Sequence, residues 1–196
     1  MQVVLATRNA GKLKEMQAIF APLGFQLSSQ AEHDLPSVPE TGKTFVENAL
    51  IKAHYAAAAT DLPAIADDSG LVVPVLNGEP GIYSARYAGD DASDADNNRK
   101  LLDALADHTY PVPAYFYCAM VYAAHGTDPT PHIATAAWHG AIVAEPQGAN
   151  GFGYDPLFLV NDMEVTSAQL EAAEKNRISH RGQACRMLLA QLQTAA

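Results

Sequence analysis

The sequence predicts an α/β fold built around a mixed β-sheet. Short apolar runs of β character alternate with stretches whose apolar residues recur at helical spacing, beginning with the run 2–6 and the helical pattern that follows it. The long apolar run 114–124 and its partner 132–145 are joined by a Pro-containing turn, which predicts an antiparallel pair. Strand–helix units combined with such a pair imply a sheet that is not purely parallel.

Length and composition indicate one continuous domain over residues 1–196. The chain has 196 residues, of which 48% are hydrophobic and 17% charged, so it can bury one sizeable core with room for two lobes. No apolar run approaches the roughly 20 residues of a membrane span, and the N-terminus lacks the basic region of a signal peptide. We therefore expect a cytoplasmic protein without membrane contact.

The charge and the cysteines exclude two further classes of protein. The formal net charge of −10 argues against stable nucleic-acid binding, because clusters of Lys and Arg hold phosphate backbones. A few local cations remain compatible with a small anionic ligand. Cys118 and Cys185 lack the spacing of a zinc site or a disulfide framework, so we expect both to be core thiols.

The first strand runs directly into the loop Thr7-Arg8-Asn9-Ala10-Gly11-Lys12. Apolar residues from Leu13 to Leu23 then fall at helical spacing, and Pro22-Leu23-Gly24 closes the helix. Backbone N–H groups at such a helix start attract phosphate, and Lys12 adds a positive charge. The loop lacks the first glycine of a Walker A motif, so an ordinary turn remains an alternative.

A second short strand over 25–29 precedes a polar loop that contains Glu40. The sequence Thr44-Phe45-Val46-Glu47 has the form of a capping box and predicts a helix that reaches about Thr60. Capping is accordingly the simpler role for Glu47. Asn48 and Lys52 are four residues apart and share a helix face that a ligand can use.

Two adjacent acids, Asp67 and Asp68, interrupt the apolar run that extends from Ala64 to Leu76. We expect a strand here, with the acids at the point where it turns. Adjacent carboxylates near a core need neutralisation, and a divalent cation is their usual partner. An Asx-turn with two solvated acids is the alternative.

The second half of the chain continues the alternation of helices and strands. A helix is expected over 90–106, a short strand over 157–160, and two helical segments over 167–174 and 176–193. The glycine-rich stretch Gly151-Phe152-Gly153-Tyr154-Asp155 offers close backbone approach and aromatic stacking surface, although a simple hairpin end has the same composition.

A cluster of polar residues opens the last predicted helix. Its members are Lys175, Arg177, Ser179, His180 and Arg181. Cations are disfavoured at a helix start by the helix dipole, so the cluster suggests a bound anion.

Six motifs occur in an order and at spacings that resemble the inosine triphosphate pyrophosphatase family, most closely its bacterial members. The resemblance spans nearly the whole chain. The motifs are Thr7-x-Asn9-x-x-Lys12, Glu40-Thr41-Gly42-x-Thr44-Phe45-x-Glu47-Asn48-Ala49, Ala66-Asp67-Asp68-Ser69-Gly70-Leu71, Pro80-Gly81-Ile82-Tyr83-Ser84-Ala85-Arg86-Tyr87, Gly151-Phe152-Gly153-Tyr154-Asp155-Pro156 and Ser179-His180-Arg181-Gly182.

The resemblance implies a house-cleaning enzyme that hydrolyses non-standard purine nucleoside triphosphates (ITP, dITP and XTP) to the monophosphate and pyrophosphate. It further implies a two-lobed α/β fold with a long curved mixed β-sheet flanked by helices, an active-site cleft between the lobes, Mg²⁺ as cofactor and a homodimer. The two alternatives are a similarly folded pyrophosphatase for modified pyrimidine nucleotides and a nucleotide-binding sensor without catalysis.

The same resemblance assigns roles to individual residues. Asp68 is the expected proton acceptor and a metal ligand, with Glu40 as the other metal-site carboxylate. The triphosphate is expected to contact Thr7, Arg8, Asn9, Ala10, Gly11 and Lys12, with Ser69 and Lys175 as further substrate contacts. The base and sugar are expected to contact Phe152, Gly153, Tyr154 and Asp155, and the 6-keto edge of the purine His180 and Arg181. Supporting candidates are Glu47, Lys52 and Asp67. Arg8 stands at a variable position and either contacts phosphate or points to solvent.

Water attack on the α-phosphorus requires residue types that this chain contains. The reaction needs a base, a cation that bridges phosphate oxygens, and positive charge for the departing pyrophosphate. Asp68 with Mg²⁺ meets the first two requirements, and Lys12, Lys52 and Lys175 are candidates for the third.

Overall fold

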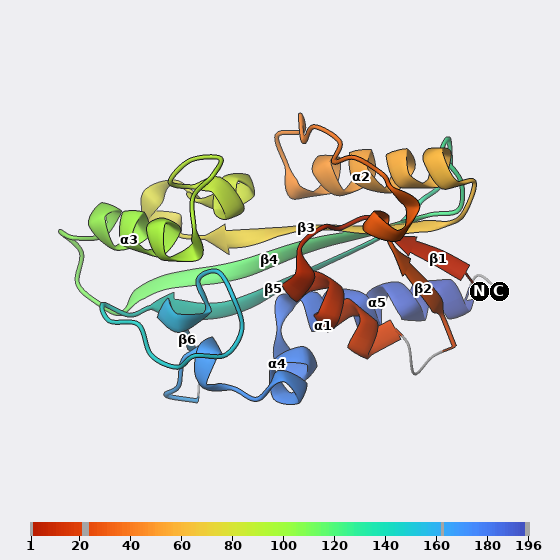
Figure 1. The fold of residues 1–196 in the computed structure, drawn as a ribbon. Helices are drawn as coiled ribbons and strands as arrows, with labels where there is room; N and C mark the ends of the chain where they lie inside the picture. The colour runs from red at the N-terminus through yellow and green to blue at the C-terminus, as the bar shows by residue number, and fades with distance from the viewer. Residues whose placement is uncertain (1, 21–23, 162, 195–196) are drawn as a thin grey trace. The chain divides into compact units, whose positions relative to one another are not determined.

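The computed structural model describes residues 2–20, 24–161 and 163–194, which form a six-stranded sheet flanked by helices (Figure 1). The strands are β1 (Gln2–Leu5), β2 (Gln26–Ser29), β3 (Ala64–Val72), β4 (Val112–Ala123), β5 (His132–Ile142) and β6 (Phe158–Val160). The helices are α1 (Ala10–Phe20), α2 (Phe45–Thr60), α3 (Asp94–Ala104), α4 (Ala172–Ile178) and α5 (His180–Thr194). Among these described helices, none has the length and apolar composition that crossing a bilayer requires.

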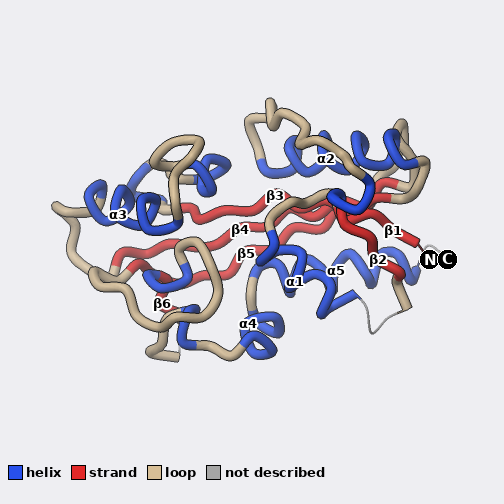
Figure 2. The backbone as a smooth tube through the Cα atoms, in the orientation of Figure 1, coloured by secondary structure: helices blue, strands red, loops and turns tan. Residues whose placement is uncertain are grey.

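The sheet is mixed, as the sequence predicts. Its strand order is β2-β1-β3-β4-β5-β6. β1 pairs in parallel with β2 and with β3, whereas β5 pairs antiparallel with β6. Figure 2 shows the strands in red. The parallel part comes from strand–helix units and the antiparallel part from the long hairpin of β4 and β5, which confirms the predicted α/β class.

Contacts divide the described residues into two compact units. Unit 1 contains the described residues of three ranges: Met1–Asp68, Cys118–Ala136 and His180–Ala196. Unit 2 contains the described residues of Ser69–Tyr117 and Ala137–Ser179. The boundaries fall within β3, β4 and β5, so these three strands contribute residues to both units.

In unit 1, helices cover both faces of the strands. α2 lies on one side of β1 and β3, and α1 and α5 lie together on the other side (Figure 1). The buried stripe of α2 consists of small side chains, which allow a helix to pack close to a sheet. These residues are Ala49, Ala53, Ala56 and Ala57. The opposite layer is a core of larger residues: Val3, Leu5, Met16, Phe20, Ile65, Met120, Leu188 and Leu189.

Unit 2 has a core of its own, in which aromatic rings predominate. Phe158 lies with its ring centroid 4.6 Å from that of Phe116 and 5.1 Å from that of Trp138. Leu101 and Leu105 anchor α3 and its end in the same cluster. Burial of such rings contributes a large apolar area, so this cluster fixes the framework on which the unit 2 loops stand.

One predicted strand boundary is wrong, and one predicted helix end is not tested. β3 ends at Val72, and Pro74–Leu76 forms a 3₁₀ turn instead of continuing the strand, because proline cannot donate to a sheet ladder. The end predicted for α1 at Pro22-Leu23 lies outside the described residues.

The C-terminal helices divide at a different residue from the one predicted. α4 ends at Ile178 and α5 begins at His180, with Ser179 in an extended conformation between them. Lys175 and Arg177 therefore lie in the last turn of α4, where the helix dipole favours cations. The prediction that these two residues stand at a helix start is wrong, so the dipole argument for a bound anion does not apply to them.

Both cysteines are buried and free, as expected for core thiols. Burial raises the pKa of the Cys118 thiol to about 12 and that of the Cys185 thiol well above its usual range. At neutral pH both side chains are protonated and behave as small apolar groups.

The turn between β4 and β5 depends on one carboxylate. Asp128 accepts hydrogen bonds from the backbone N–H groups of Ala124 and Thr130, both at 2.9 Å. These bonds, the one from Ala124 first, outweigh desolvation and lower the pKa of Asp128 below its usual 3.8. A lowered pKa means that the carboxylate stabilises the fold above about pH 4, and this contribution is lost as pH falls through the folded-state value.

We predict that Asp128→Ala lowers the free energy of unfolding at pH 7 by about 1 to 3 kcal/mol, since two backbone donors lose their acceptor. Urea unfolding at pH 7 and at pH 3.5 measures the effect. Asp128→Asn is the matched control, because it retains one acceptor oxygen and removes the titration. The difference in the free energy of unfolding between wild type and Asp128→Asn should be smaller at pH 3.5 than at pH 7. An equal difference at both pH values would contradict the stabilising role of the Asp128 carboxylate.

Candidate active site

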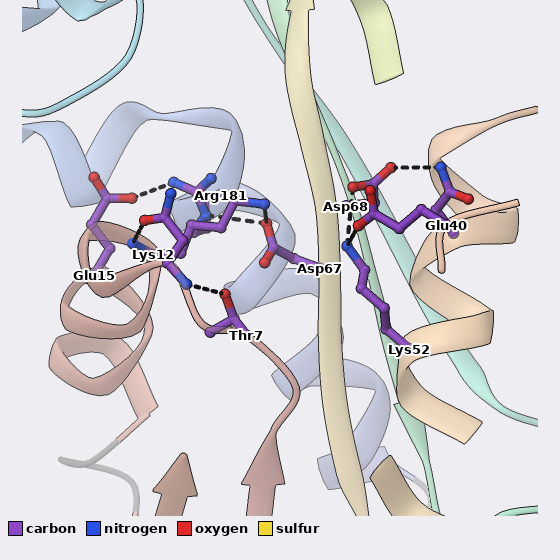
Figure 3. Close-up of polar contacts among 10 residues, drawn as sticks. Thr7, Lys12, Glu15, Glu40, Lys52, Asp67, Asp68 and Arg181 are labelled. Atoms are coloured by element: carbon purple, nitrogen blue, oxygen red, sulfur yellow. Dashed lines mark hydrogen bonds and ion pairs between the residues drawn. The ribbon is translucent and has the colours of Figure 1, made fainter. Parts of the chain in front are cut away.

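The two adjacent acids lie in the middle of β3, not at a turn as the sequence suggested. Asp67 is 1% exposed and Asp68 6% exposed. Because successive side chains of a strand project to opposite faces, the two carboxylates have different neighbours. Figure 3 shows Asp67 directed toward α1 and α5, and Asp68 directed toward α2. The strand continues through the acids because cations from these flanking helices compensate each of them.

Asp67 is the centre of a buried network of charges. Its Oδ2 atom lies 3.0 Å from Lys12 Nζ and 3.4 Å from Arg181 Nε. Burial alone would raise the pKa of Asp67, but the charges of Lys12 and Arg181 hold it well below its usual range. Arg181 also pairs with Glu15 on α1, and the two acids keep the pKa of the guanidinium above its usual value despite burial.

Asp68 belongs to a second group of polar side chains, on the α2 side of the strand. Lys52 Nζ lies 3.0 Å from Asp68 Oδ1 and 2.7 Å from Glu40 Oε1, and Asn48 Nδ2 donates to Asp68 Oδ2 at 3.3 Å. Burial raises the pKa of Asp68 above 3.8, although Lys52 opposes the shift. For Lys52, burial would lower the pKa, but the charge of Asp68 and its acidic neighbours raises it.

The donor set around Lys52 fits a divalent cation. The carboxylates of Glu40 and Asp68 converge on one point, where the Lys52 ammonium supplies the positive charge. Within the described part of the chain, no group of three or more His, Cys, Asp and Glu side chains forms a metal site. Mg²⁺ commonly uses one or two carboxylates and completes its shell with water and substrate phosphates, so two carboxylates suit it.

The predicted triphosphate loop connects β1 to α1. Asn9 Oδ1 accepts from Lys12 N at 3.0 Å, and Thr7 Oγ1 accepts from Asn9 N at 3.2 Å. Ala10 and Gly11 form the first turn of α1. The loop is thus fixed by its own side chains, and the N-terminus of α1 carries the positive end of the helix dipole.

Arg8 binds the backbone of the loop that follows residue 33. Its Nη2 atom donates to the Leu35 carbonyl at 2.5 Å, and Gln30 Nε2 donates to the Pro36 carbonyl at 2.6 Å. These bonds fix the segment that leads to Glu40. Arg8 therefore links the triphosphate loop to the segment that carries a predicted metal-site carboxylate.

Glu47 caps a helix. Its Oε2 atom accepts from Lys43 N at 2.7 Å and from Thr44 Oγ1 at 3.0 Å, while Thr44 Oγ1 accepts from Glu47 N. The hydrogen bond from Lys43, followed by that from Thr44, lowers the pKa of the Glu47 carboxyl. The carboxylate is exposed and makes these bonds around the start of α2, which supports capping as its role.

In unit 2, Asp155 organises the glycine-rich loop. Its carboxylate accepts from Phe152 N at 2.9 Å, from Ser167 Oγ at 2.8 Å and from Lys175 Nζ at 2.6 Å. Gly151 adopts a φ of +78°, and a Cβ there would lie 2.0 Å from Asp155 Oδ2, so only glycine fits. Asp155 and Lys175 form a buried pair that shapes the loop.

The two aromatic residues of this loop differ in their surroundings. Tyr154 is 4% exposed and its hydroxyl donates to the Ser84 carbonyl at 2.9 Å. Burial raises the pKa of Tyr154 above its usual range. Phe152 remains partly exposed, with Lys175 Nζ 4.8 Å from its ring centroid. Phe152 is therefore better placed than Tyr154 to offer a stacking surface.

The motif from Pro80 to Tyr87 has a structural role in unit 2. Ser84 Oγ accepts from Leu71 N at 2.9 Å and donates to the Gly81 carbonyl at 2.6 Å. A Cβ at Gly70 would lie 2.3 Å from Ser84 Oγ, so glycine permits this close approach. Ser84 thereby connects Tyr154 to the end of β3, next to the partly exposed Ser69.

The predicted site residues fall into the two units. Unit 1 contains the loop 7–12, Glu40, Asp68, His180 and Arg181, whereas unit 2 contains Ser69, the loop 152–155 and Lys175. His180 is buried at the start of α5. Glu15, which pairs with Arg181, was not predicted as a site residue. A signal was present, because Glu15 follows Lys12 by three residues and so shares its face of α1.

We predict unequal effects of neutralising the two adjacent acids. Asp67→Asn leaves Lys12 and Arg181 without their shared counter-ion and should lower the free energy of unfolding by about 3 to 5 kcal/mol at pH 7. Asp68→Asn should change it by less than about 1 kcal/mol, because the raised pKa of Asp68 shows that its charge is not favoured by folding.

Urea unfolding of both variants tests this pair. The Asp67 contribution should be full above about pH 4 and disappear as pH falls, in keeping with its lowered pKa. Equal destabilisation by the two substitutions would contradict the different environments of the acids.

Comparison with known proteins places these features in a family. A family model described as the Ham1 family matches residues 3–191. A dITP/XTP pyrophosphatase of Thioalkalivibrio sulfidiphilus is 52% identical over 194 residues, covering 98% of this chain and 99% of that protein. A dITP/XTP pyrophosphatase of Escherichia coli K12 is 50% identical over 193 residues, covering 96% of both.

A solved structure supports the same relationship. The HAM1 protein from Coxiella burnetii superposes with a TM-score of 0.91 at 47% identity, and the match covers 100% of both chains. Sequence and fold agree over the full length, which confirms the family resemblance found in the motifs. The chain belongs to the Ham1 family.

Proposed function

We propose that this protein is a nucleoside triphosphate pyrophosphatase that hydrolyses ITP, dITP and XTP to the nucleoside monophosphate and pyrophosphate. Relatives of about half-identical sequence carry the name dITP/XTP pyrophosphatase. The observation in the structure that best supports this function is the convergence of Asp68 and Glu40 on Lys52, close to the cationic residues on the other side of β3. Such an arrangement suits a phosphoanhydride and a divalent cation.

Asp68 is our candidate for the general base. Burial raises its pKa, which makes its carboxylate a stronger proton acceptor than an exposed one, and Asn48 and Lys52 fix its orientation. In the proposed step Asp68 takes a proton from water, the water oxygen bonds to the α-phosphorus, and the bond from this phosphorus to the bridging oxygen breaks. The electron pair leaves with pyrophosphate.

Glu40 and Asp68 would hold Mg²⁺. The ion, when bound, polarises phosphate oxygens and offsets the charge that develops on them. Lys52 lies between the two carboxylates, so its ammonium must share them with the metal or turn toward the phosphates. Either arrangement keeps a positive charge beside the reacting group.

The triphosphate would bind at the loop Thr7 to Lys12. Backbone N–H groups at the start of α1 and the Lys12 ammonium supply donors for the phosphate oxygens and positive charge for the leaving pyrophosphate. The pairing of Lys12 with Asp67 fixes the lysine in a partly buried position beside this loop. Lys175, which pairs with Asp155 in unit 2, acts in our proposal mainly by shaping the base loop.

Recognition of the base would depend on Arg181 and His180. A donor that faces the 6-position pairs with the keto group of hypoxanthine or xanthine and not with the amino group of adenine. Leaving a buried donor unpaired costs about 1 to 3 kcal/mol, which corresponds to roughly ten- to a hundredfold discrimination. Asp67 and Glu15 fix the guanidinium of Arg181 from two sides, which limits its freedom to adapt to adenine.

A nucleotide panel with Mg²⁺ tests the proposed activity. We expect pyrophosphate to be released from ITP, dITP and XTP, with ATP at least tenfold slower because its amino group leaves a donor unpaired. Coupled assays that separate pyrophosphate from orthophosphate measure the product, and Asp68→Asn should abolish turnover. Orthophosphate as first product, or equal turnover of ATP, would overturn the proposal. Turnover of modified pyrimidine nucleotides, or tight ITP binding without hydrolysis, would support one of the two alternatives.

A second test concerns the metal site. Glu40→Gln removes one of two converging carboxylates, so the Mg²⁺ concentration for half-maximal rate should rise by about ten- to a hundredfold. Titration of the ITP rate with Mg²⁺ measures this shift. Glu47→Gln is the control, because hydrogen bonds from Lys43 and Thr44 engage that carboxylate at the start of α2. Equal shifts in both variants would contradict the assignment of Glu40.

A homodimer and a cytoplasmic location complete the proposal. The dimer follows from the family resemblance and the location from the sequence, so both stay predictions. Light scattering coupled to gel filtration measures the oligomeric state directly.

A further inference from the structure

Two side chains of α3 bind both backbone polar groups of one residue in the glycine-rich loop. The Gly153 N–H donates to Asp94 Oδ2 at 2.7 Å, and the Gly153 carbonyl accepts from Asn98 Nδ2 at 3.0 Å. Gly153 has a φ of +62°, in the left-handed region. Two side chains therefore fix a backbone conformation that most residues avoid.

The helix that supplies these side chains is itself well anchored. Asp94 and Asn98 are four residues apart, so they project from the same face of α3. The helix begins with a capping box in which Ser93 and Asp96 bind each other's backbone N–H groups. Its Leu101 is fully buried in the unit 2 core. α3 is therefore held in place by its cap and by the core, and the hydrogen bonds of Asp94 and Asn98 hold the loop against it.

The loop that they hold contains the surface expected to receive the nucleoside. Phe152 precedes Gly153 and is partly exposed, while Tyr154 follows it and is tied to Ser84. Asp155 fixes the Phe152 N–H from the other side. With both polar groups of Gly153 engaged by α3, the orientation of the Phe152 ring depends on the pair Asp94 and Asn98.

We propose that Asp94 and Asn98 are positioning residues that hold the base loop, residues 152–155, in the conformation that binds the nucleoside of the substrate. This inference rests on the proposed function and extends it to two residues that do not touch the reacting phosphates. A loop that is already ordered loses less conformational entropy when the nucleotide binds. Removal of either side chain should therefore weaken binding and leave the chemical step unchanged.

The structure offers closely matched variants. Asp94→Ala removes the acceptor of the Gly153 N–H, and Asp94→Asn retains an acceptor oxygen as a conservative rescue. Asp96→Ala is the control, because it removes the same charge from the same turn of α3 and breaks the cap without contacting the loop. Asp96→Ala therefore reports what a weakened helix start does by itself.

Asn98 allows stability and positioning to be separated. Its Oδ1 atom is buried and finds no hydrogen-bond partner among the described residues, while Nδ2 binds Gly153. A buried acceptor without a partner is unfavourable, so Asn98→Leu removes a destabilising atom together with the bond to the loop. The melting temperature should not fall, whereas the binding of nucleotide should weaken.

The experiment measures KM and kcat for ITP and, in parallel, amide hydrogen exchange of the loop without nucleotide. We expect Asp94→Ala and Asn98→Leu to raise KM about tenfold, with kcat within about twofold of wild type. Asp94→Asn should have a KM close to that of wild type. Exchange of the Gly153 amide should be faster in Asp94→Ala, and Asp96→Ala should match wild type in KM.

Different failures have different signatures. A KM for Asp96→Ala as high as that for Asp94→Ala, a loss of kcat without change in KM, or an unchanged KM in both loop variants would each overturn the positioning role. If wild type does not hydrolyse ITP, the proposed function fails. In that event, unchanged amide exchange at Gly153 in Asp94→Ala would also overturn the positioning role of Asp94. Faster exchange would show that Asp94 holds the loop even though the substrate is a different one.

Discussion

The alternation of side chains along β3 is the constraint on which the candidate site depends. Asp67 and Asp68 are neighbours in sequence, yet the strand directs them to opposite faces of one sheet. Each carboxylate is buried and requires cations of its own, which α1 and α5 supply on one face and α2 on the other. The strand thus separates a rigid charge network from a group of residues suited to bind a metal.

This separation assigns different physical states to two identical side chains. Asp67 is surrounded by cations, so its charge is strongly favoured and it contributes to the stability of unit 1. Burial raises the pKa of Asp68, because the single ammonium that it shares with Glu40 compensates its charge only in part. A carboxylate that folding leaves undercompensated is ready to accept a cation or a proton. The excess negative charge is therefore confined to the face where Mg²⁺ would bind.

The sequence predicted features with a local cause and failed where the cause lies far along the chain. The start of α2 was predictable because Thr44 and Glu47 are adjacent to the helix that they cap. The acids of β3 were expected at a turn, since nothing near them in sequence compensates their charge. Their compensation comes in part from Arg181, which is 114 residues from Asp67. The role of Asp94 and Asn98 was not predicted for the same reason, because both residues lie far from Gly153 in the sequence.

The burial of Cys118 and Cys185 makes both thiols resistant to oxidants. Oxidants and alkylating agents attack the thiolate, and a Cys118 pKa of about 12 leaves almost none of it at neutral pH. Both sulfur atoms are also shielded from solvent in unit 1. Neither thiol is therefore open to covalent modification while the protein stays folded. A thiol reagent should accordingly label Cys118 and Cys185 only when unit 1 opens, so labelling reports on the unfolding of the interior beside Asp67 and Arg181.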